Sequence, residues 1–323
     1  WQHTTPNPWG ITFDKWGNAF QVYGDGQVYD GSSLIWTPLG TYHPFRYAHV
    51  CSYGKGSAVA SVSSPNFPDR FKQAVASASL LGRYAVNLTA ISYKDGMVKE
   101  VDHEAILSSP NPAFRPADVE FGMDGALYVS DFCSPIIGHA QHPMRDPHWD
   151  HDYGRIWRIV HTGKPIVKDW PKIEGAPAKE LCQLLLHEQN IVRHHARIEL
   201  RKLINSGTDL LDEWLKSISG SHKYLEGVLE VIFIREGLNQ ASPNLIQKLL
   251  TSENPLLRGA GVQALRQQAD RIDDIGEILS PLVNDPHPRV QIEVIDAVAH
   301  LRPTHPNLDL ILAAAGAWYS HSY

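Results

Sequence analysis

The chain has 323 residues, of which 43% are hydrophobic and 20% are charged, a composition typical of globular proteins. At about 100 to 200 residues per domain, this length predicts two domains. The formal charge of -6 argues against a nucleic-acid partner and against an anionic membrane surface. No apolar run approaches the roughly 18 to 20 residues of a bilayer span, and no signal peptide is recognisable. Because the chain starts with Trp1 rather than Met, we expect a fragment or a processed piece of a longer protein.

The first half has the pattern of an all-β structure. Of the 30 aromatic residues, 23 precede residue 166, and Asp-Gly pairs recur there between short β-type runs. Residues 7–25 align by eye with residues 115–131, since each reads as Pro, short strand, Gly-containing turn, second strand and Asp. Residues 58–92 suggest a third unit of this kind. Residues 1–163 are therefore predicted to be about three C-terminal blades of a β-propeller with two open edges, because a closed propeller typically needs about four to eight blades.

The second half has helical periodicity. Residues 164–177 carry three prolines and a glycine and are predicted to be a linker. From residue 178 to 323, apolar residues recur at helical spacing, and Arg193, Arg258 and Arg289 each follow an Asn or Asp by three or four residues. The last two arginines are 31 residues apart and the first two are 65 apart, close to twice that spacing. This pattern predicts a HEAT-like α-solenoid. The fold class is therefore β plus α, in two domains.

The candidate chemistry lies in an insertion. Between the predicted strands 126–131 and 154–159, a tight turn is replaced by 22 residues, 132–153. In a propeller blade this connection opens on the same face as the entry to the first strand, so the insertion and Arg115 should meet. Three interpretations of the insertion remain open: an active-site or cofactor-facing loop, a structural loop that satisfies its own backbone, and a metal site. Arg115 and Asp131 are equally well explained as a framework pair closing the blade ends or as ligand-binding residues. The candidate cofactor- or substrate-binding residues are Arg115, Asp131, His139, His142, Arg145, Asp146, Asp150 and His151.

Cys51, Cys133 and Cys182 are far apart and odd in number. They form no CxxC or CxxCH spacing, which excludes a disulfide framework, a cysteine zinc cluster and a haem attachment motif within the chain. We expect three buried thiols.

Residues 114–131 (FRPADVEFGMDGALYVSD), 135–142 (PIIGHAQH), 145–147 (RDP), 150–151 (DH) and 154–157 (GRIW) resemble the Pirellula/Verrucomicrobium-type membrane-bound dehydrogenase family. The resemblance extends to residues 7–10 and 13–17 and into the helical half. It implies a quinoprotein sugar dehydrogenase-like propeller (glucose or sorbosone dehydrogenase type), then HEAT repeats, commonly followed by a cytochrome c domain. The chain departs from the family pattern at Cys133-Ser134, at Tyr153 and at Pro65-Asn66.

Two classes of function follow. The resemblance implies an oxidoreductase of the periplasm or cell envelope that binds pyrroloquinoline quinone and Ca²⁺, oxidises a small sugar or polyol, and passes electrons to a haem domain absent from this chain. The eight candidate residues would then contact cofactor or substrate, and no residue is assigned as the catalytic base. The alternative is a non-catalytic propeller that recognises a carbohydrate or a protein, with the HEAT repeats as a scaffold.

Overall fold

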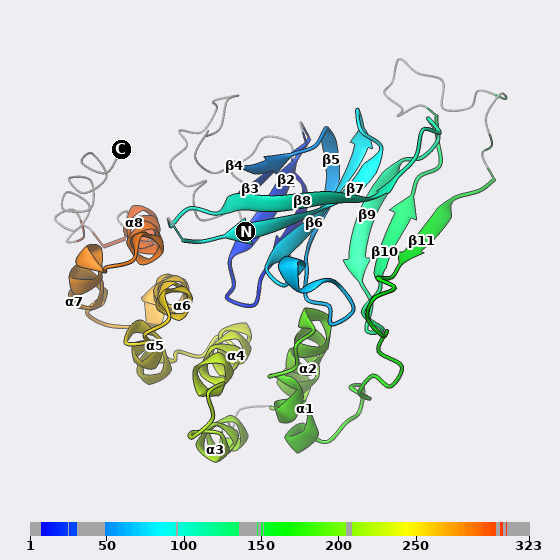
Figure 1. The fold of residues 1–323 in the computed structure, drawn as a ribbon. Coiled ribbons are helices and arrows are strands. Elements are labelled where there is room, and N and C mark those ends of the chain that lie inside the picture. The colour runs from blue at the N-terminus through cyan, green and yellow to red at the C-terminus, as the bar shows by residue number, and fades with distance from the viewer. Residues whose placement is uncertain are drawn as a thin grey trace. The chain divides into compact units, whose positions relative to one another are not determined.

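A computed structural model of the chain divides it into two compact units, residues 1–170 and residues 171–323. The division falls within the Pro-rich segment 164–177. The first unit contains antiparallel sheets and the second contains helices (Figure 1), so the predicted mixed β and α organisation is confirmed. The structure describes residues 8–24, 26–30, 49–94, 96–135, 147, 150, 152–204, 209–301, 304–305 and 308.

The strands of the first unit form three antiparallel sheets, and in each sheet the neighbouring strands follow one another in sequence (Figure 1). The first sheet contains β1 (Pro8–Phe13), β2 (Ala19–Tyr23), β3 (Gln27–Asp30) and β4 (His49–Ser52). The second contains β5 (Lys55–Ser61), β6 (Ala74–Leu81), β7 (Ala85–Ser92) and β8 (Lys99–Ser108), with a short 3-10 helix, η2 (Asp69–Phe71), before β6. The third contains β9 (Pro116–Phe121), β10 (Leu127–Asp131) and β11 (Arg155–Ile159).

The three sheets pack through their first strands, because β5 contacts both β1 and β9. A hydrophobic core lies between the second and third sheets. To this core the second sheet supplies mainly small buried side chains, including Ala60, Ala76 and Ala78. The third sheet supplies larger ones, such as Phe121 and Leu127. Alanines on one face and bulkier residues on the other let two sheets approach closely while the space between them stays filled.

The two aligned sequence segments fold as equivalent hairpins, β1–β2 and β9–β10. Each turn contains a glycine with positive φ, Gly17 at 89° and Gly125 at 83°. Each turn also has an aspartate whose Oδ1 accepts main-chain N–H groups: Asp14 accepts from Trp16 and Asn18, and Asp124 accepts from Ala126. The predicted hairpin repeat is confirmed. It could be predicted because turn conformations of this kind depend on residue types within a few positions of sequence.

A close backbone approach connects the ends of the first two sheets. Gly26, between β2 and β3, has φ of 93°, and a Cβ placed there would lie 1.2 Å from the carbonyl oxygen of Gly54. Only glycine permits this approach, so the turn of one sheet rests directly on the entry to β5.

The helices of the second unit are arranged as four consecutive pairs (Figure 1). The longer second helices of the pairs contact one another in succession, α2 with α4, α4 with α6, and α6 with α8. The eight α-helices among the described residues are α1 (Ala178–Leu184), α2 (Asn190–Leu203), α3 (Asp209–Ser217), α4 (Tyr224–Gly237), α5 (Pro243–Leu250), α6 (Pro255–Gln267), α7 (Ile275–Leu279) and α8 (Pro288–Leu301). Two 3-10 helices, η3 (Ala269–Arg271) and η4 (Ser280–Asn284), accompany them.

The same turn precedes the second helix of every pair. Three residues before each of these helices, a side chain accepts a hydrogen bond from the main-chain N–H two residues further on. These acceptors are His187, Ser221, Ser252 and Asp285, and the helices begin at residues 190, 224, 255 and 288. The repeat length is therefore 34, 31 and 33 residues. The spacing of the arginines in the sequence predicted a period of this length. It did not locate the second copy of the repeat, which has no arginine at the equivalent position.

The arginine alignment needs one correction. Arg193 Nη1 donates to the carbonyl of His187, and Arg258 Nη1 donates to that of Ser252, which is the same place in the repeat. In the last pair, the donor to the equivalent carbonyl of Asp285 is Gln291 Nε2, at 2.8 Å. Arg289 is therefore not the counterpart of the other two arginines. Instead, it forms a buried ion pair with Glu293 on its own helix.

Ion pairs connect neighbouring helix pairs of this unit. Arg197 of α2 binds Glu230 of α4 at 2.6 Å, and Arg266 of α6 pairs with a carboxylate of α8, that of Asp296. Arg258 makes a two-pronged contact with Asp285, with both N···O distances 2.7 Å. These carboxylates are buried, so removal of all the arginines that face one of them would leave a buried charge without a counterion.

Candidate functional site

The insertion follows β10, and its first residues meet Arg115 as the sequence predicted. Of the eight candidate residues, the structure describes Arg115, Asp131 and Asp150. The other five lie outside the described residues, so their place stays a prediction; they are His139, His142, Arg145, Asp146 and His151.

Arg115 immediately precedes β9 and is 4% exposed. Its guanidinium binds three main-chain carbonyls. Nη1 donates to Leu80 of β6 at 2.8 Å, Nε donates to Ser134 at 3.0 Å, and Nη2 donates to Pro135 at 2.7 Å. One side chain thus joins the second sheet to the start of the insertion.

Asp131 is the last residue of β10, and its side chain is fully buried. Oδ1 accepts hydrogen bonds from the main-chain N–H groups of Arg115 and Cys133, each at 2.9 Å. Oδ2 accepts from Trp157 Nε1 at 3.0 Å, and Arg155 Nε lies 3.0 Å from the same oxygen as an ion pair rather than an aligned hydrogen bond. Because Trp157 and Arg155 belong to β11, the carboxylate connects both ends of the insertion.

A second contact joins the same two ends. Arg155 Nη2 donates to Cys133 Sγ at 2.9 Å, and Asp131 is the strand partner of Arg155. Asp150 stands apart from this cluster: it is exposed, and its Oδ1 accepts from the N–H of Asp152. The structure therefore brings Arg115 and Asp131 together as a buried clamp. Their geometry favours the framework interpretation, and a ligand role for them stays a prediction.

Several residues of this region were not candidates in the sequence. Arg155 and Trp157 bind the Asp131 carboxylate, and the ring of Tyr84 lies 4.5 Å from the Arg115 guanidinium carbon. Of these residues, only Arg155 could have been found from the sequence. Antiparallel pairing of the predicted strands 126–131 and 154–159 places Asp131 opposite the start of the second strand, where Arg155 lies. Tyr84 belongs to another sheet, and nothing in the local sequence connects it with the insertion.

The thiols differ in their surroundings. Cys51 and Cys182 are buried, and burial raises the pKa of Cys51 to about 12 and that of Cys182 to about 11. Both therefore stay protonated and unreactive near neutral pH. Cys133 is only partly buried, which corrects the expectation of three buried thiols. The departure results from its place at the exposed start of the insertion.

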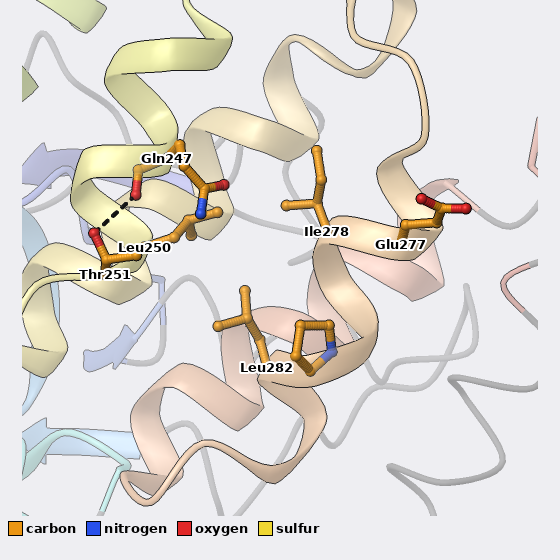
Figure 2. Close-up of a pocket in the computed structure, with 7 residues that line it drawn as sticks. Gln247, Leu250, Thr251, Glu277, Ile278 and Leu282 are labelled. Carbon is orange, nitrogen blue, oxygen red and sulfur yellow. Dashed lines mark hydrogen bonds between the residues drawn. The ribbon is translucent and has the colours of Figure 1, made fainter.

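A groove of about 380 Å³ lies in the helical unit, between α5 and the α7–η4 segment (Figure 2). Apolar side chains such as Leu250, Ile278 and Leu282 line most of it, and Thr251 Oγ1 donates to the Gln247 carbonyl at its edge. Glu277 is the one titratable side chain among its lining residues, so the groove does not contain the paired groups that acid–base or metal chemistry requires.

Within the part of the chain that the structure describes, no group of three or more His, Cys, Asp or Glu side chains could hold a metal ion. Over the same residues, no helix is both long enough and apolar enough to cross a membrane.

Residues 26–163 match the model of a family described as a domain of unknown function, DUF7133. This range extends from just before β3 to just after β11. No curated protein matches the chain. A crystal structure from Thermus thermophilus, named "putative oxidoreductase (glucose dehydrogenase)", is similar at 21% identity with a TM-score of 0.30. The similarity covers 47% of this chain and 44% of that one, so the chain spans less than half the length of that protein.

Proposed function

We propose that this chain is part of a quinoprotein-type sugar or alcohol dehydrogenase. In this proposal the three sheets are blades of a β-propeller, and the four helix pairs form a HEAT-like scaffold. The sheet order supports the blade assignment, because each sheet is an antiparallel meander and β5 packs against the first strand of each neighbouring sheet. The near-constant repeat of 31 to 34 residues in the helical unit supports the scaffold assignment.

The observation that supports placing the ligand site in the insertion is the buried clamp that anchors its ends. The side chains of Arg115 and Asp131 take part in six hydrogen bonds, and three of these reach residues 133–135 at the start of the insertion. The ends of a long connection with four histidines and several aspartates are thus fixed to the sheets by buried groups. Long connections inside a compact domain are commonly functional.

The described residues do not by themselves form the quinone and calcium site. They contain no metal-binding group of three acidic, histidine or cysteine side chains, and every side-chain nitrogen of Arg115 donates to a carbonyl of the protein. When bound, the quinone would supply the two-electron acceptor for an alcohol or aldose carbon. We therefore assign the contacts with cofactor or substrate to the insertion, at His139, His142, Arg145, Asp146, Asp150 and His151.

The helical unit would act as the scaffold for a haem domain or for another protein partner, and the resemblance to membrane-bound dehydrogenases supports a location in the periplasm or cell envelope.

The hydrogen bonds that Arg115 and Asp131 make within the protein favour a second candidate function. A non-catalytic propeller that binds carbohydrate needs no cationic site for a quinone, and the same insertion could contact sugar hydroxyl groups.

A titration of the full chain tests the proposal. Purified protein is titrated with pyrroloquinoline quinone in the presence and absence of Ca²⁺ by calorimetry, and oligosaccharides are titrated in parallel. We expect quinone binding that requires Ca²⁺. A parent protein that binds neither quinone nor Ca²⁺ would contradict the dehydrogenase proposal, and binding of oligosaccharide alone would support the second candidate.

A double variant localises the binding site. We expect H139A/H142A to lose quinone binding with its melting temperature nearly unchanged, because an excursion between two strands contributes little to the strand ladder. The control is H194A/H195A, which removes an exposed adjacent pair of histidines on α2 and should bind quinone as the parent does. Loss of the melting transition in H139A/H142A would show that the insertion has a structural role.

A further inference from the structure

We propose that Tyr84, in the turn between β6 and β7 of the second sheet, is a positioning residue for residues 133–135, the start of the insertion that follows β10 of the third sheet. The inference rests on the proposed function in one respect, namely that the insertion carries the ligand contacts. Tyr84 acts through Arg115, which binds the main chain of Ser134 and Pro135 at the start of that insertion.

The backbone of Tyr84 is the first observation. Its φ is 47°, in the left-handed region, where a large aromatic residue is an outlier. Glycine occupies such a position without strain, and Gly82, two residues earlier, has φ of 90° with its nearest neighbouring atom 3.8 Å from a Cβ placed there. The strain at Tyr84 persists because the surrounding contacts of the ring compensate for it.

The ring of Tyr84 makes the compensating contact. The guanidinium carbon of Arg115 lies 4.5 Å from the ring centroid, within the range of a cation–π interaction, which is stronger when the cation is removed from water. Arg115 is buried, and its Nη1 donates to the Leu80 carbonyl at the end of β6. The β6–β7 hairpin therefore holds the guanidinium both by its face and by one edge.

The other edge of the guanidinium faces the insertion. Nε and Nη2 bind the carbonyls of Ser134 and Pro135, and Cys133 just before them has a left-handed φ of 52°. The guanidinium thus contacts the ring of one residue with a left-handed backbone, Tyr84, and the carbonyls that directly follow another, Cys133. A continuous set of contacts runs from Tyr84 through Arg115 to residues 134 and 135, so the second sheet determines the path of the chain as it leaves β10.

Hydrogen–deuterium exchange of the full chain tests this role, with the peptide covering residues 131–135 as the readout. We expect Tyr84→Gly, which relieves the backbone strain and removes the ring, to raise exchange in this peptide about two- to fivefold. Its melting temperature should be unchanged or higher. Tyr84→Phe keeps the ring and should exchange as the parent does. A fall in melting temperature with unchanged exchange at 131–135 would show that Tyr84 only packs, and would overturn the proposal.

Two further variants separate the ring from glycine flexibility. Tyr84→Asn lacks the ring, tolerates left-handed backbone, and should raise exchange as the glycine variant does; a rise with glycine alone would overturn the proposal. Asp274→Gly is the matched control, because Asp274 is an exposed left-handed residue (φ 56°) of the helical unit, and it should leave the 131–135 peptide unchanged. Exchange requires no ligand, so a failed quinone titration would overturn the proposed function alone.

Discussion

Asn66 connects two loops of the first unit through one buried amide. Its side chain is fully buried, its Nδ2 donates to the carbonyls of His161 and Lys164, and its Oδ1 accepts from the His161 N–H at 2.8 Å. This amide therefore attaches the segment after β11 to the loop between β5 and β6. In the sequence Asn66 was visible only as a departure from the resembling family, because its partners are main-chain groups 95 or more residues away.

We expect Asn66→Ala to destabilise the first unit by about 2 to 3 kcal/mol, since it removes the side-chain donor to the His161 and Lys164 carbonyls and the acceptor of the His161 N–H. Scanning calorimetry of the full chain would measure the loss. Asn111→Ala is the matched control: Asn111 is exposed and its Oδ1 accepts only the local N–H of Ala113, so its effect should be well under half as large. Equal effects of the two variants would contradict a bridging role for Asn66.

At the same scale, Arg115 and Asp131 illustrate the limit of residue-by-residue prediction. Their chemistry suggested a ligand site as readily as a framework pair. The structure favours the framework because the groups that satisfy them include the carbonyls of Leu80, Ser134 and Pro135. Main-chain carbonyls occur at every residue, so sequence alone contains no sign of which ones an arginine will bind.

Among the elements, the turn before each second helix shows what repetition in sequence can miss. The acceptor position is occupied by His187, Ser221, Ser252 and Asp285 in the four copies. Any side chain with an acceptor atom can fill this role, so the conformation repeats although the residue type does not. The arginine pattern was more conspicuous, but it identified two of the equivalent donors and substituted Arg289 for Gln291.

The use of histidine in this turn predicts a pH dependence. His187 Nδ1 accepts a hydrogen bond from the N–H of Gln189 at 3.1 Å, so this nitrogen must carry no proton. Burial lowers the pKa of His187 below its ordinary value of 6.5, and the nearby cations Arg193 and Lys223 act in the same direction. The unfolded chain then binds the proton more tightly than the folded one. The stability is fully present above pH 6.5 and is lost as pH falls below it toward the folded-state pKa.

We expect His187→Ser to reduce this loss, because serine fills the same position in the second and third copies. Urea unfolding of the helical transition at about pH 7.5, 6.0 and 5.0 would give the midpoints, and the fall between the extremes should be smaller in the variant than in the parent. His222→Ser, at an exposed position before α4, should fall as the parent does. A parent and a His187→Ser variant with parallel pH profiles would contradict the role assigned to this imidazole.

At the scale of the whole molecule, the two compact units differ in how their cores are built. Each helix pair of the second unit buries its apolar side chains against its own partner helix and the adjacent pairs. Its core includes fully buried residues from the first pair onward, such as Leu181, Leu185 and Leu200. Stability in such an array is close to a sum of local terms.

We therefore expect residues 171–323, expressed alone, to fold cooperatively. Circular dichroism should show a helical spectrum and a sigmoidal thermal transition. Residues 1–170 alone should aggregate more readily, because the edge strand β11 and its neighbours expose Tyr153 and Ile156, at 70% and 77%. A random-coil spectrum for the helical fragment would contradict this expectation.

By itself, the sequence determined the division into a β half and an α half, the β1–β2 and β9–β10 hairpins, and a repeat of just over 30 residues in the helical half. These features depend on periodicity and turn residues within short segments, where each residue's neighbours in sequence are also its neighbours in space. Only the tertiary structure decided that Arg115 joins Leu80 to Pro135, that Asn66 binds His161, and that Tyr84 lies against the guanidinium. These contacts pair side chains with main-chain groups or rings on other elements, and the partner groups have no residue-specific pattern in the sequence.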